Sequence, residues 1–316
     1  MESVNLENRP ADTPGMKRLA QKVGRMASDT GFLLLEGHGI AEELIGRCFL
    51  VARQFFAMDS EAKNLLATTR FRPENPNSYR GYFPLLQDDP SFKEGFEFGR
   101  CSYPDRSFPE TTLWPAIVGF KETMQEIHLE LSALAGYLLK LLSIYLDKDP
   151  SFMQEDFQDG MSTFRIIHYP EKATGEITSH QGFSTPDHTD SGFITLLIQD
   201  DTGGLEALWP DGHWKTIEPG PGTIVMNLGD LLSFISGNTL KATRHRVRSP
   251  SRSRISMPFF YEPSPDTLIP YPVAPGDNES KEVKTGKPGR IRYADYLTEK
   301  IQSFGEYSHK KSDRLA

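Results

Sequence analysis

Residues 185–214 read TPDHTDSGFITLLIQDDTGGLEALWPDGHW, and they place His188 two residues before Asp190. The pair stands at the start of an apolar run, which leads into a turn rich in glycine and acidic residues. On a β-strand, residues i and i+2 lie on one face, so both side chains can point at one ion. On a helix they diverge by about 200° and cannot. The short apolar runs and intervening turns favour strands here.

The same pattern of short runs continues from residue 161 to 262. The expected strands are STFRIIHY, FITLLIQ, LEALW, HWKTIE, GTIVMNL, LLSFISG, ATRHRVR and SRISMPFFYE, with turns at DDTGG, WPDGHW and EPGPGT. About eight short antiparallel strands are typical of a double-sheet jelly roll or a related barrel.

Helices are expected on both sides of this β-rich segment. The pattern predicts helices over 14–30, 41–67, 112–147 and about 292–303, a buried strand within 31–40, and loops with short strands over 70–110. The longest of these helices carries apolar residues in alternating steps of three and four, which gives one continuous apolar face. The predicted fold class is therefore mainly β with helices. It has a jelly-roll core (156–265), a helical, mixed N-terminal region (1–155) and a C-terminal helical segment (266–316).

The composition of the 316-residue chain narrows the class of protein. The net charge of −8 argues against nucleic acid as a partner, and two cysteines are too few for a disulfide framework. We see no apolar stretch long enough to cross a bilayer and no apolar signal segment at the N-terminus. We therefore expect a soluble, cytoplasmic protein without a membrane partner. The sequence does not give the oligomeric state, and we assume a monomer.

A metal site at His188 and Asp190 needs a third ligand from elsewhere in the fold. The remaining candidates are His38, His168, His180, His213, His245 and His309. His245 lies in an expected strand of the same β-rich segment and reaches the pair only if the sheet curls back. Two histidines and one carboxylate with open positions are typical of non-haem Fe(II) oxygenases. Zinc accepts the same ligands, and ordinary polar residues on a half-buried sheet are the third alternative.

A second polar pair lies on the last expected strand of this segment. Arg254 and Ser256 share one face, and Ile255 and Met257 lie on the other with the following odd-numbered apolar residues. An arginine that points into a barrel needs an anion, and a carboxylate is its best planar partner. Tyr169, at the end of FRIIHY, can add a donor. We interpret the neighbouring arginines as a solvated edge strand: Arg246, Arg248 and Arg252.

Together these motifs resemble the Fe(II)/2-oxoglutarate-dependent dioxygenases of the isopenicillin N synthase-like family. The resemblance covers roughly residues 15–300. It rests on eight pieces in the family's order: GFLLLEGHGI, YRGYFPL, FKEGFEFG, FRIIHYP, HTDSGFITLLIQD-DTGGLEAL, WKTIEPGPGTIVMNLGDLL, ATRHRV and RISMPFFYEP. The family fold is a double-stranded β-helix with a helical N-terminal region, which agrees with the strand and helix pattern.

The resemblance implies roles for particular residues. It assigns Fe(II) and the catalytic centre to His188, Asp190 and His245. It assigns the distal carboxylate of 2-oxoglutarate to Arg254 and Ser256, with Tyr169 and Asn227 also at the co-substrate. Where many plant members have Asn-Tyr-Tyr-Pro, this chain has Ile167-His168-Tyr169-Pro170. We expect His168 to be a core histidine bonded to backbone.

The resemblance also implies the reaction. Dioxygen and 2-oxoglutarate are consumed together, and oxidative decarboxylation is coupled to hydroxylation, desaturation or ring closure of a small organic metabolite, with a role in secondary metabolism. Phe260, the 70–100 loop and the C-terminal segment are expected to line the substrate pocket. Three alternatives stay open at this point: a 2-oxoglutarate-independent iron oxidase of the same fold, a non-catalytic metal- or ligand-binding β-barrel, and a zinc hydrolase.

Overall fold

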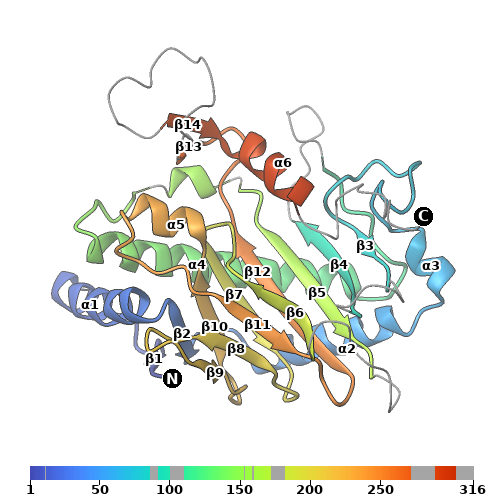
Figure 1. The fold of residues 1–316 in the computed structure, drawn as a ribbon, viewed down its shortest axis with the longest axis horizontal. Helices are drawn as coiled ribbons and strands as arrows, with labels where there is room; N and C mark the ends of the chain where they lie inside the picture. Colours follow the sequence, from blue (N-terminus) through green and yellow to red (C-terminus); the bar gives the residue numbers. More distant parts are fainter. Residues whose placement is uncertain are drawn as a thin grey trace.

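The computed structural model describes residues 1–10, 12–85, 92–99, 110–152, 154–158, 160–171, 182–271 and 289–303. Its centre is two β-sheets that face each other (Figure 1). The major sheet has the strand order β1-β2-β10-β7-β12-β5-β4-β3 and the minor sheet the order β6-β11-β8-β9. All pairings in the two sheets are antiparallel except that of β1 with β2. The predicted fold class, a jelly-roll core with helices, is confirmed.

The strands of the major sheet come from both the N-terminal region and the expected core. They are β1 (Ser3–Asn5), β2 (Phe32–Glu36), β3 (Tyr82–Phe83), β4 (Glu94–Gly99), β5 (Thr163–Tyr169), β7 (Ile194–Gln199), β10 (Ile224–Leu228) and β12 (Arg254–Tyr261). The minor sheet has β6 (Phe183–His188), β8 (Leu205–Leu208), β9 (Trp214–Thr216) and β11 (His245–Arg248). A separate pair is β13 (Leu268–Tyr271) with β14 (Gly289–Arg292). The division of the chain at 155/156 and 265/266 stays a prediction.

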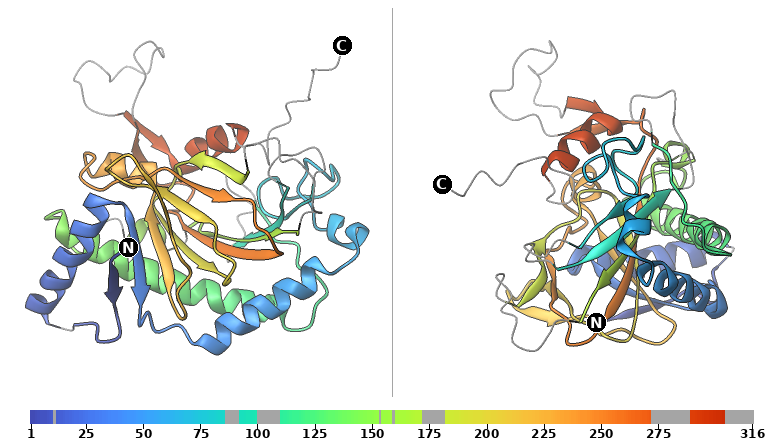
Figure 2. Two further views of the ribbon diagram at one scale, coloured as in Figure 1. Left: turned by 60° about the horizontal axis from the view of Figure 1, so that its bottom comes forward. Right: turned by 90° about the vertical axis from the view of Figure 1, so that its right-hand side faces the viewer.

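Helices cover the outer face of the major sheet (Figures 1 and 2). They are α1 (Thr13–Asp29), α2 (Glu42–Phe56), α3 (Ser60–Asn64), α4 (Phe120–Tyr145), the 3-10 turn η1 (Glu155–Phe157), α5 (Asp230–Ile235) and α6 (Tyr293–Ser303). The long helix α4 packs against α1, α2, β7 and β12. Its apolar face therefore closes the core from the side opposite the minor sheet.

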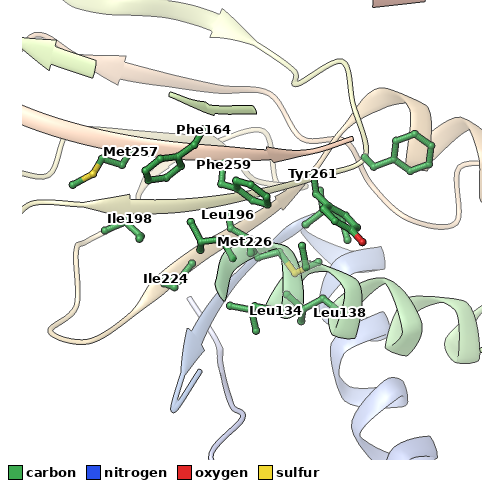
Figure 3. Packing of buried hydrophobic residues seen from close by; sticks show 14 of the residues in the cluster. Leu134, Leu138, Phe164, Leu196, Ile198, Ile224, Met226, Met257, Phe259 and Tyr261 are labelled. Atoms are coloured by element: carbon green, nitrogen blue, oxygen red, sulfur yellow. The ribbon is translucent and has the colours of Figure 1, made fainter. Parts of the chain in front are cut away.

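Strict alternation along the major strands separates the core from the space between the sheets. On β12, Met257, Phe259 and Tyr261 pack toward Leu134 and Leu138 of α4 (Figure 3). The intervening residues on β12 point toward the minor sheet, into a cavity described below. The same parity holds on β5, β7 and β10, where Phe164, Leu196 and Met226 face α4. One face of the sheet thus forms the core, and the other is left for chemistry.

Helix α4 corrects one expectation about hydropathy. Its 26 residues include a window with a mean hydropathy of 1.4, so in length and composition it matches a membrane span, contrary to our reading of the sequence. More than half of that window is buried within the protein. The packing of α4 under the major sheet accounts for this apolar character.

Several predicted boundaries were wrong. LLSFISG, expected as a strand, contains most of the short helix α5, because Gly229 and Asp230 open a helical turn and Gly237 (φ 63°) ends it. The helix expected from residue 112 begins at Phe120, after Pro115 and after Gly119 with φ 76°. The segment 41–67 is divided into α2 and α3. Strand β6 was missed because its sequence, FSTPDH, has no apolar alternation.

Candidate metal and co-substrate site

Three side chains predicted as metal ligands meet where the two sheets face each other. His188 is the last residue of β6, and Asp190 lies two residues further along the chain. His245 is the first residue of β11. His188 and His245 are Cα partners across the antiparallel pair β6–β11. The Nε2 atom of His188 lies 3.8 Å from Asp190 Oδ1, and the Nε2 atom of His245 lies 3.7 Å from it. One potential ligand atom from each residue lies within 4.8 Å of the others.

The other ring nitrogen of each imidazole, Nδ1, makes a hydrogen bond to the backbone. His188 Nδ1 lies 2.9 Å from the carbonyl oxygen of Pro186, and His245 Nδ1 lies 3.0 Å from that of Thr243. A carbonyl can only accept, so each Nδ1 carries the proton and donates. Each Nε2 is therefore left unprotonated, within 4 Å of Asp190 Oδ1. This is the arrangement in which outer hydrogen bonds fix the tautomer of a metal-binding histidine.

The carboxylate of Asp190 is fixed in a similar way. Its Oδ2 accepts a hydrogen bond of 2.5 Å from Thr195 Oγ1 and one of 2.7 Å from Asn227 Nδ2. Thr195 and Asn227 are Cα partners on β7 and β10, so the sheet register presents both donors together. Oδ1, the atom that faces the histidines, remains for a cation. The site thus offers two nitrogens and one oxygen to a common point.

Electrostatics favour the protonation states that a metal site needs. The His188 side chain is 40% exposed at its rim, but desolvation of the ring between the sheets, together with repulsion from His245 whenever that ring is protonated, lowers the pKa of the His188 imidazole to about 4. Burial opposes the ionisation of Asp190, but His245, His188 and the hydrogen bonds from Thr195 and Asn227 together lower the pKa of its carboxyl group. At neutral pH, His188 is neutral and Asp190 is charged, and metal binding requires both states.

A buried arginine lies deeper in the same cavity. Arg254 is 1% exposed, and its guanidinium carbon lies 5.0 Å from the centroid of the Tyr169 ring. Its Nη2 makes one long contact of 3.4 Å with Gln199 Oε1. Within the described part of the chain, its Nε and Nη1 are buried without any hydrogen-bond partner. A buried charged group with orphaned donors is costly unless a ligand satisfies it, and a carboxylate fits this fork.

The cavity joins the metal ligands to this arginine. It measures about 90 Å³ and is lined by both groups and by Ser256, Tyr169, Asn227 and Phe260. Ser256 and Tyr169 flank Arg254, and the Tyr169 hydroxyl lies 3.4 Å from Thr185 Oγ1. Asn227, expected at the co-substrate, lines the cavity and donates to Asp190. The donor set at the deep end fits the distal carboxylate of 2-oxoglutarate, because it combines an unsatisfied guanidinium with a hydroxyl.

Other histidines that were considered lie elsewhere. His38 is buried and accepts a hydrogen bond from the backbone of Ile40, and the side chain of His213 is 80% exposed in its turn. His168 was expected to bond to backbone, but its ring nitrogens contact Glu94 Oε1 at 2.9 Å and Ser253 Oγ at 3.0 Å. It lies on the face of β5 opposite Tyr169. His180 and His309 lie outside the described residues, as do residues 86–91 and 100 of the 70–100 loop.

The interpretation of the arginine cluster also needs correction. Strand β11 is not an edge strand, because it lies between β6 and β8. Arg246 and Arg248 both contact Glu206, and the Arg246 guanidinium lies 4.1 and 3.9 Å from the ring centroids of Phe183 and Trp214. Arg252 pairs with Asp201. Ion pairing thus accounts for these arginines, none of which lines the cavity.

Several residues that line the cavity were not singled out from the sequence, and three of them carry polar or charged groups near the ligands. Thr195 holds Asp190, and Lys93 and Arg165 line the cavity on another side. Strand parity carries the signal for two of them: Thr195 lies on the polar face of its strand, and Arg165 shares a face with Tyr169 on β5. Lys93 has no strand parity because it precedes β4, but it lies in the 70–100 segment that was expected to line the pocket.

Comparison with known proteins agrees with this geometry. Residues 161–263 match the 2OG-Fe(II) oxygenase superfamily, and residues 2–117 match the family described as non-haem dioxygenase in morphine synthesis N-terminal. The 2-oxoglutarate-Fe(II) type oxidoreductase hxnY of Emericella nidulans is 33% identical over 276 residues, which cover 81% of this chain and 77% of the relative. The 2-oxoglutarate-dependent dioxygenase citB of Monascus ruber is 30% identical over 261 residues, which cover 78% of this chain and 79% of the relative.

Solved structures show the same fold. A full-length Neurospora crassa protein, solved in complex with alpha-KG and 5-formyluracil, superposes with a TM-score of 0.79 at 26% identity, and 96% of each chain is covered. A putative 2OG-Fe(II) oxygenase family protein from Caulobacter crescentus superposes with a TM-score of 0.77 at 28% identity, covering 96% of this chain and 98% of that one. This chain belongs to the 2OG-Fe(II) oxygenase superfamily. It is an Fe(II)/2-oxoglutarate-dependent dioxygenase, so the predicted reaction class and cofactors are confirmed.

Proposed function

We propose that His188, Asp190 and His245 are the ligands of the catalytic Fe(II). The observation that carries this assignment is the set of hydrogen bonds behind the three side chains. Both Nδ1 atoms and Asp190 Oδ2 are bound to protein groups, whereas both Nε2 atoms and Oδ1 face one another. Three ligands on one side of an ion leave the remaining positions open for co-substrate and dioxygen, which is the geometry of non-haem Fe(II) oxygenases.

We further propose that the distal carboxylate of 2-oxoglutarate binds Arg254 and Ser256, with Tyr169 beside it. Two buried, unpartnered guanidinium nitrogens in the same cavity as the metal ligands support this assignment. Bound iron, 2-oxoglutarate and dioxygen supply the oxidising chemistry. The chain contributes orientation and a cavity lined by apolar side chains such as Ile167 and Leu197.

The substrate that we propose is a small organic metabolite, converted by hydroxylation, desaturation or ring closure. The site is a cavity of about 90 Å³ between the two sheets, and concave sites of this kind suit a small molecule better than a polymer. The structural relative from Neurospora crassa was solved with 5-formyluracil. We propose that the protein is a cytoplasmic monomer and that it acts in secondary metabolism. We expect neither nucleic acid nor a membrane as its partner. Phe260 is proposed to contact the substrate, since it lines the cavity beside the metal ligands.

Anaerobic reconstitution tests the two binding assignments. Fe(II) and 2-oxoglutarate added together should give a visible charge-transfer band that neither gives alone. The band should be absent in His188→Ala and in Arg254→Ala, and it should persist in His213→Ala, whose side chain is exposed. Bands of equal strength in His188→Ala and the unaltered protein would refute the ligand assignment.

A further inference from the structure

The turn that carries Asp190 is held at each of its carbonyl groups. This turn, residues 190–193, lies between β6 and β7, and we call it the ligand turn. Three of its carbonyl oxygens accept hydrogen bonds from backbone N–H groups where β10 passes into α5. These bonds run from Asp230 to Asp190, from Leu231 to Gly192 and from Gly229 to Phe193, at 2.7, 3.2 and 2.9 Å. The end of β10 thus fixes most of the turn through the backbone.

The fourth carbonyl group, that of Ser191, is held by the C-terminal helix. The hydroxyl group of Tyr296 on α6 donates to it at 2.6 Å, across 105 residues of sequence. Tyr296 is 2% exposed, so water has little access to this hydrogen bond. Ser191 directly follows Asp190. Of the four hydrogen bonds to the ligand turn, this one comes from a side chain, and a single substitution can remove it.

Other contacts hold α6 against the protein. The N–H groups of its first two residues donate to carbonyl oxygens of the segment 265–267. Tyr293, one turn before Tyr296, is buried and makes a hydrogen bond to the carboxyl group of Glu262. Leu297 is buried as well. Loss of the Tyr296 hydroxyl group should therefore leave the helix in place.

Asp190 needs a fixed backbone because a metal site tolerates little displacement of its ligands, about 0.2 Å. Thr195 and Asn227 hold its Oδ2, but these hydrogen bonds fix only the far end of the side chain. The near end moves with the ligand turn. The peptide unit between Asp190 and Ser191 is planar and stiff, so the orientation of Ser191 is passed on to Asp190.

We propose that Tyr296 is a positioning residue of the iron site, and that α6 is through it a part of that site. By holding the carbonyl group of Ser191, the hydroxyl group sets the orientation of the ligand turn and the direction in which Asp190 presents Oδ1. Tyr296 is not among the residues that line the described cavity, so it acts through Asp190. This inference rests on the proposed function, because it takes Asp190 as an iron ligand.

Two variants of the full-length protein test the inference. Tyr296→Phe removes the hydroxyl group that holds the ligand turn and keeps the ring. Tyr293→Phe is the matched control, since it removes a buried hydroxyl group from the same helix, but one that binds Glu262. Each variant loses a hydrogen bond of the same kind, so the urea midpoints of unfolding should fall by similar amounts.

Metal binding should separate the two variants. In Tyr296→Phe the dissociation constant of Mn(II), measured by calorimetry, should rise about tenfold, the lower end of the effect of residues that orient a metal ligand. In Tyr293→Phe it should be unchanged. The dissociation constant of 2-oxoglutarate at saturating metal should be unchanged in both. Without oxygen, the charge-transfer band of the complex with Fe(II) and 2-oxoglutarate should shift only in Tyr296→Phe, because its energy depends on the arrangement of the ligands.

An unchanged metal affinity or an unshifted band in Tyr296→Phe would overturn the inference. An equal loss of metal affinity in both variants would overturn it too, because the docking of α6 would then explain the loss. His188→Ala separates this inference from the proposed function. If His188→Ala binds Mn(II) as tightly as the unaltered protein, the ligand assignment itself fails. If His188→Ala loses the metal and Tyr296→Phe keeps it, only the role of Tyr296 is refuted.

Discussion

The two ends of the cavity differ in how their polar atoms are satisfied. At the metal end, the polar side-chain atoms that do not face the metal position all have hydrogen-bond partners in the protein. These atoms are Nδ1 of His188, Nδ1 of His245 and Oδ2 of Asp190. At the deep end, Arg254 is more buried than the triad, but its Nε and Nη1 have no partner among the described residues. The metal end is therefore preorganised by the protein, whereas the deep end is completed only by its ligand.

This difference has an energetic consequence. Removing a ligand from the metal end should mainly remove metal binding. Removing the guanidinium from the deep end should remove co-substrate binding and also relieve a cost that the empty protein bears. A change at the deep end, unlike one at the metal end, should therefore stabilise the ligand-free protein.

The largest expected effect is at the carboxylate. Asp190→Ala should lower the affinity for Fe(II), measured with Mn(II) by calorimetry, by more than about 100-fold, since loss of an outer partner alone costs about 10–100-fold. The substitution should leave 2-oxoglutarate without its anchor at the metal as well. Far-UV circular dichroism provides the control for folding. A variant with unchanged metal affinity would show that the ion binds elsewhere.

The comparison is tested most sharply at Arg254. Arg254→Met should weaken 2-oxoglutarate binding to the metal-loaded protein by roughly 2–5 kcal/mol, the usual cost of losing one member of a buried charge pair. In the ligand-free protein it should raise the free energy of unfolding, because an apolar side chain replaces a buried, unpaired cation. Urea unfolding of both forms measures this. A destabilised empty variant would contradict the proposed difference between the two ends.

Outer partners of Asp190 should have an intermediate effect. Thr195→Val removes the hydroxyl that donates to Oδ2 and keeps the shape of the side chain. Metal affinity should fall about 10- to 100-fold, whereas the dissociation constant of 2-oxoglutarate at saturating metal should change little. Thr223→Val, at a surface turn, is the control. A greater loss of co-substrate binding than of metal binding would assign Thr195 to the other end.

Glu262 shows what happens to an unpartnered polar atom that does not line the cavity. This carboxyl group is buried at the end of β12, its Oε2 has no hydrogen-bond partner in the described structure, and burial raises its pKa to about 7. Its unfolded value is near 4.5. Between these values the folded protein holds the proton more tightly, so stability should fall as the pH rises from about 4.5 to 7. Above pH 7 this loss is complete.

Glu262→Gln should remove this part of the pH dependence, because an amide does not titrate. Urea unfolding at about pH 5 and about pH 7.5, on either side of the raised pKa, should therefore show a smaller difference for the variant than for the unaltered protein. An equal difference in both proteins would show that Glu262 ionises freely in the folded state. This is the smallest effect that we expect, and it does not involve the cavity ligands.

Much of the site follows from the sequence because β-structure has a period of two. The faces of β12 follow directly from its alternation, so the sequence alone places Arg254 and Ser256 opposite Met257 and Phe259. The triad needed one further assumption, the curling of the sheet, which brings His245 opposite His188.

Other features could not be read from local patterns. Strand β6 forms because β11 pairs with it, although its own residues have little strand character. The donors to Asp190 come from β7 and β10, which pair only in the folded sheet. The position of Lys93 depends on where the chain enters β4. In each case the decisive contact is a long-range one that the pairing of strands creates.

The central claim is that one ion is held by His188, Asp190 and His245, with 2-oxoglutarate extending from it to Arg254. A crystal structure with Mn(II) and 2-oxoglutarate, grown without oxygen and measured at the manganese absorption edge, tests this most directly. We expect one anomalous peak bonded to His188 Nε2, Asp190 Oδ1 and His245 Nε2, with a carboxylate on the Arg254 guanidinium. A peak bonded to other residues, or 2-oxoglutarate bound away from Arg254, would contradict it.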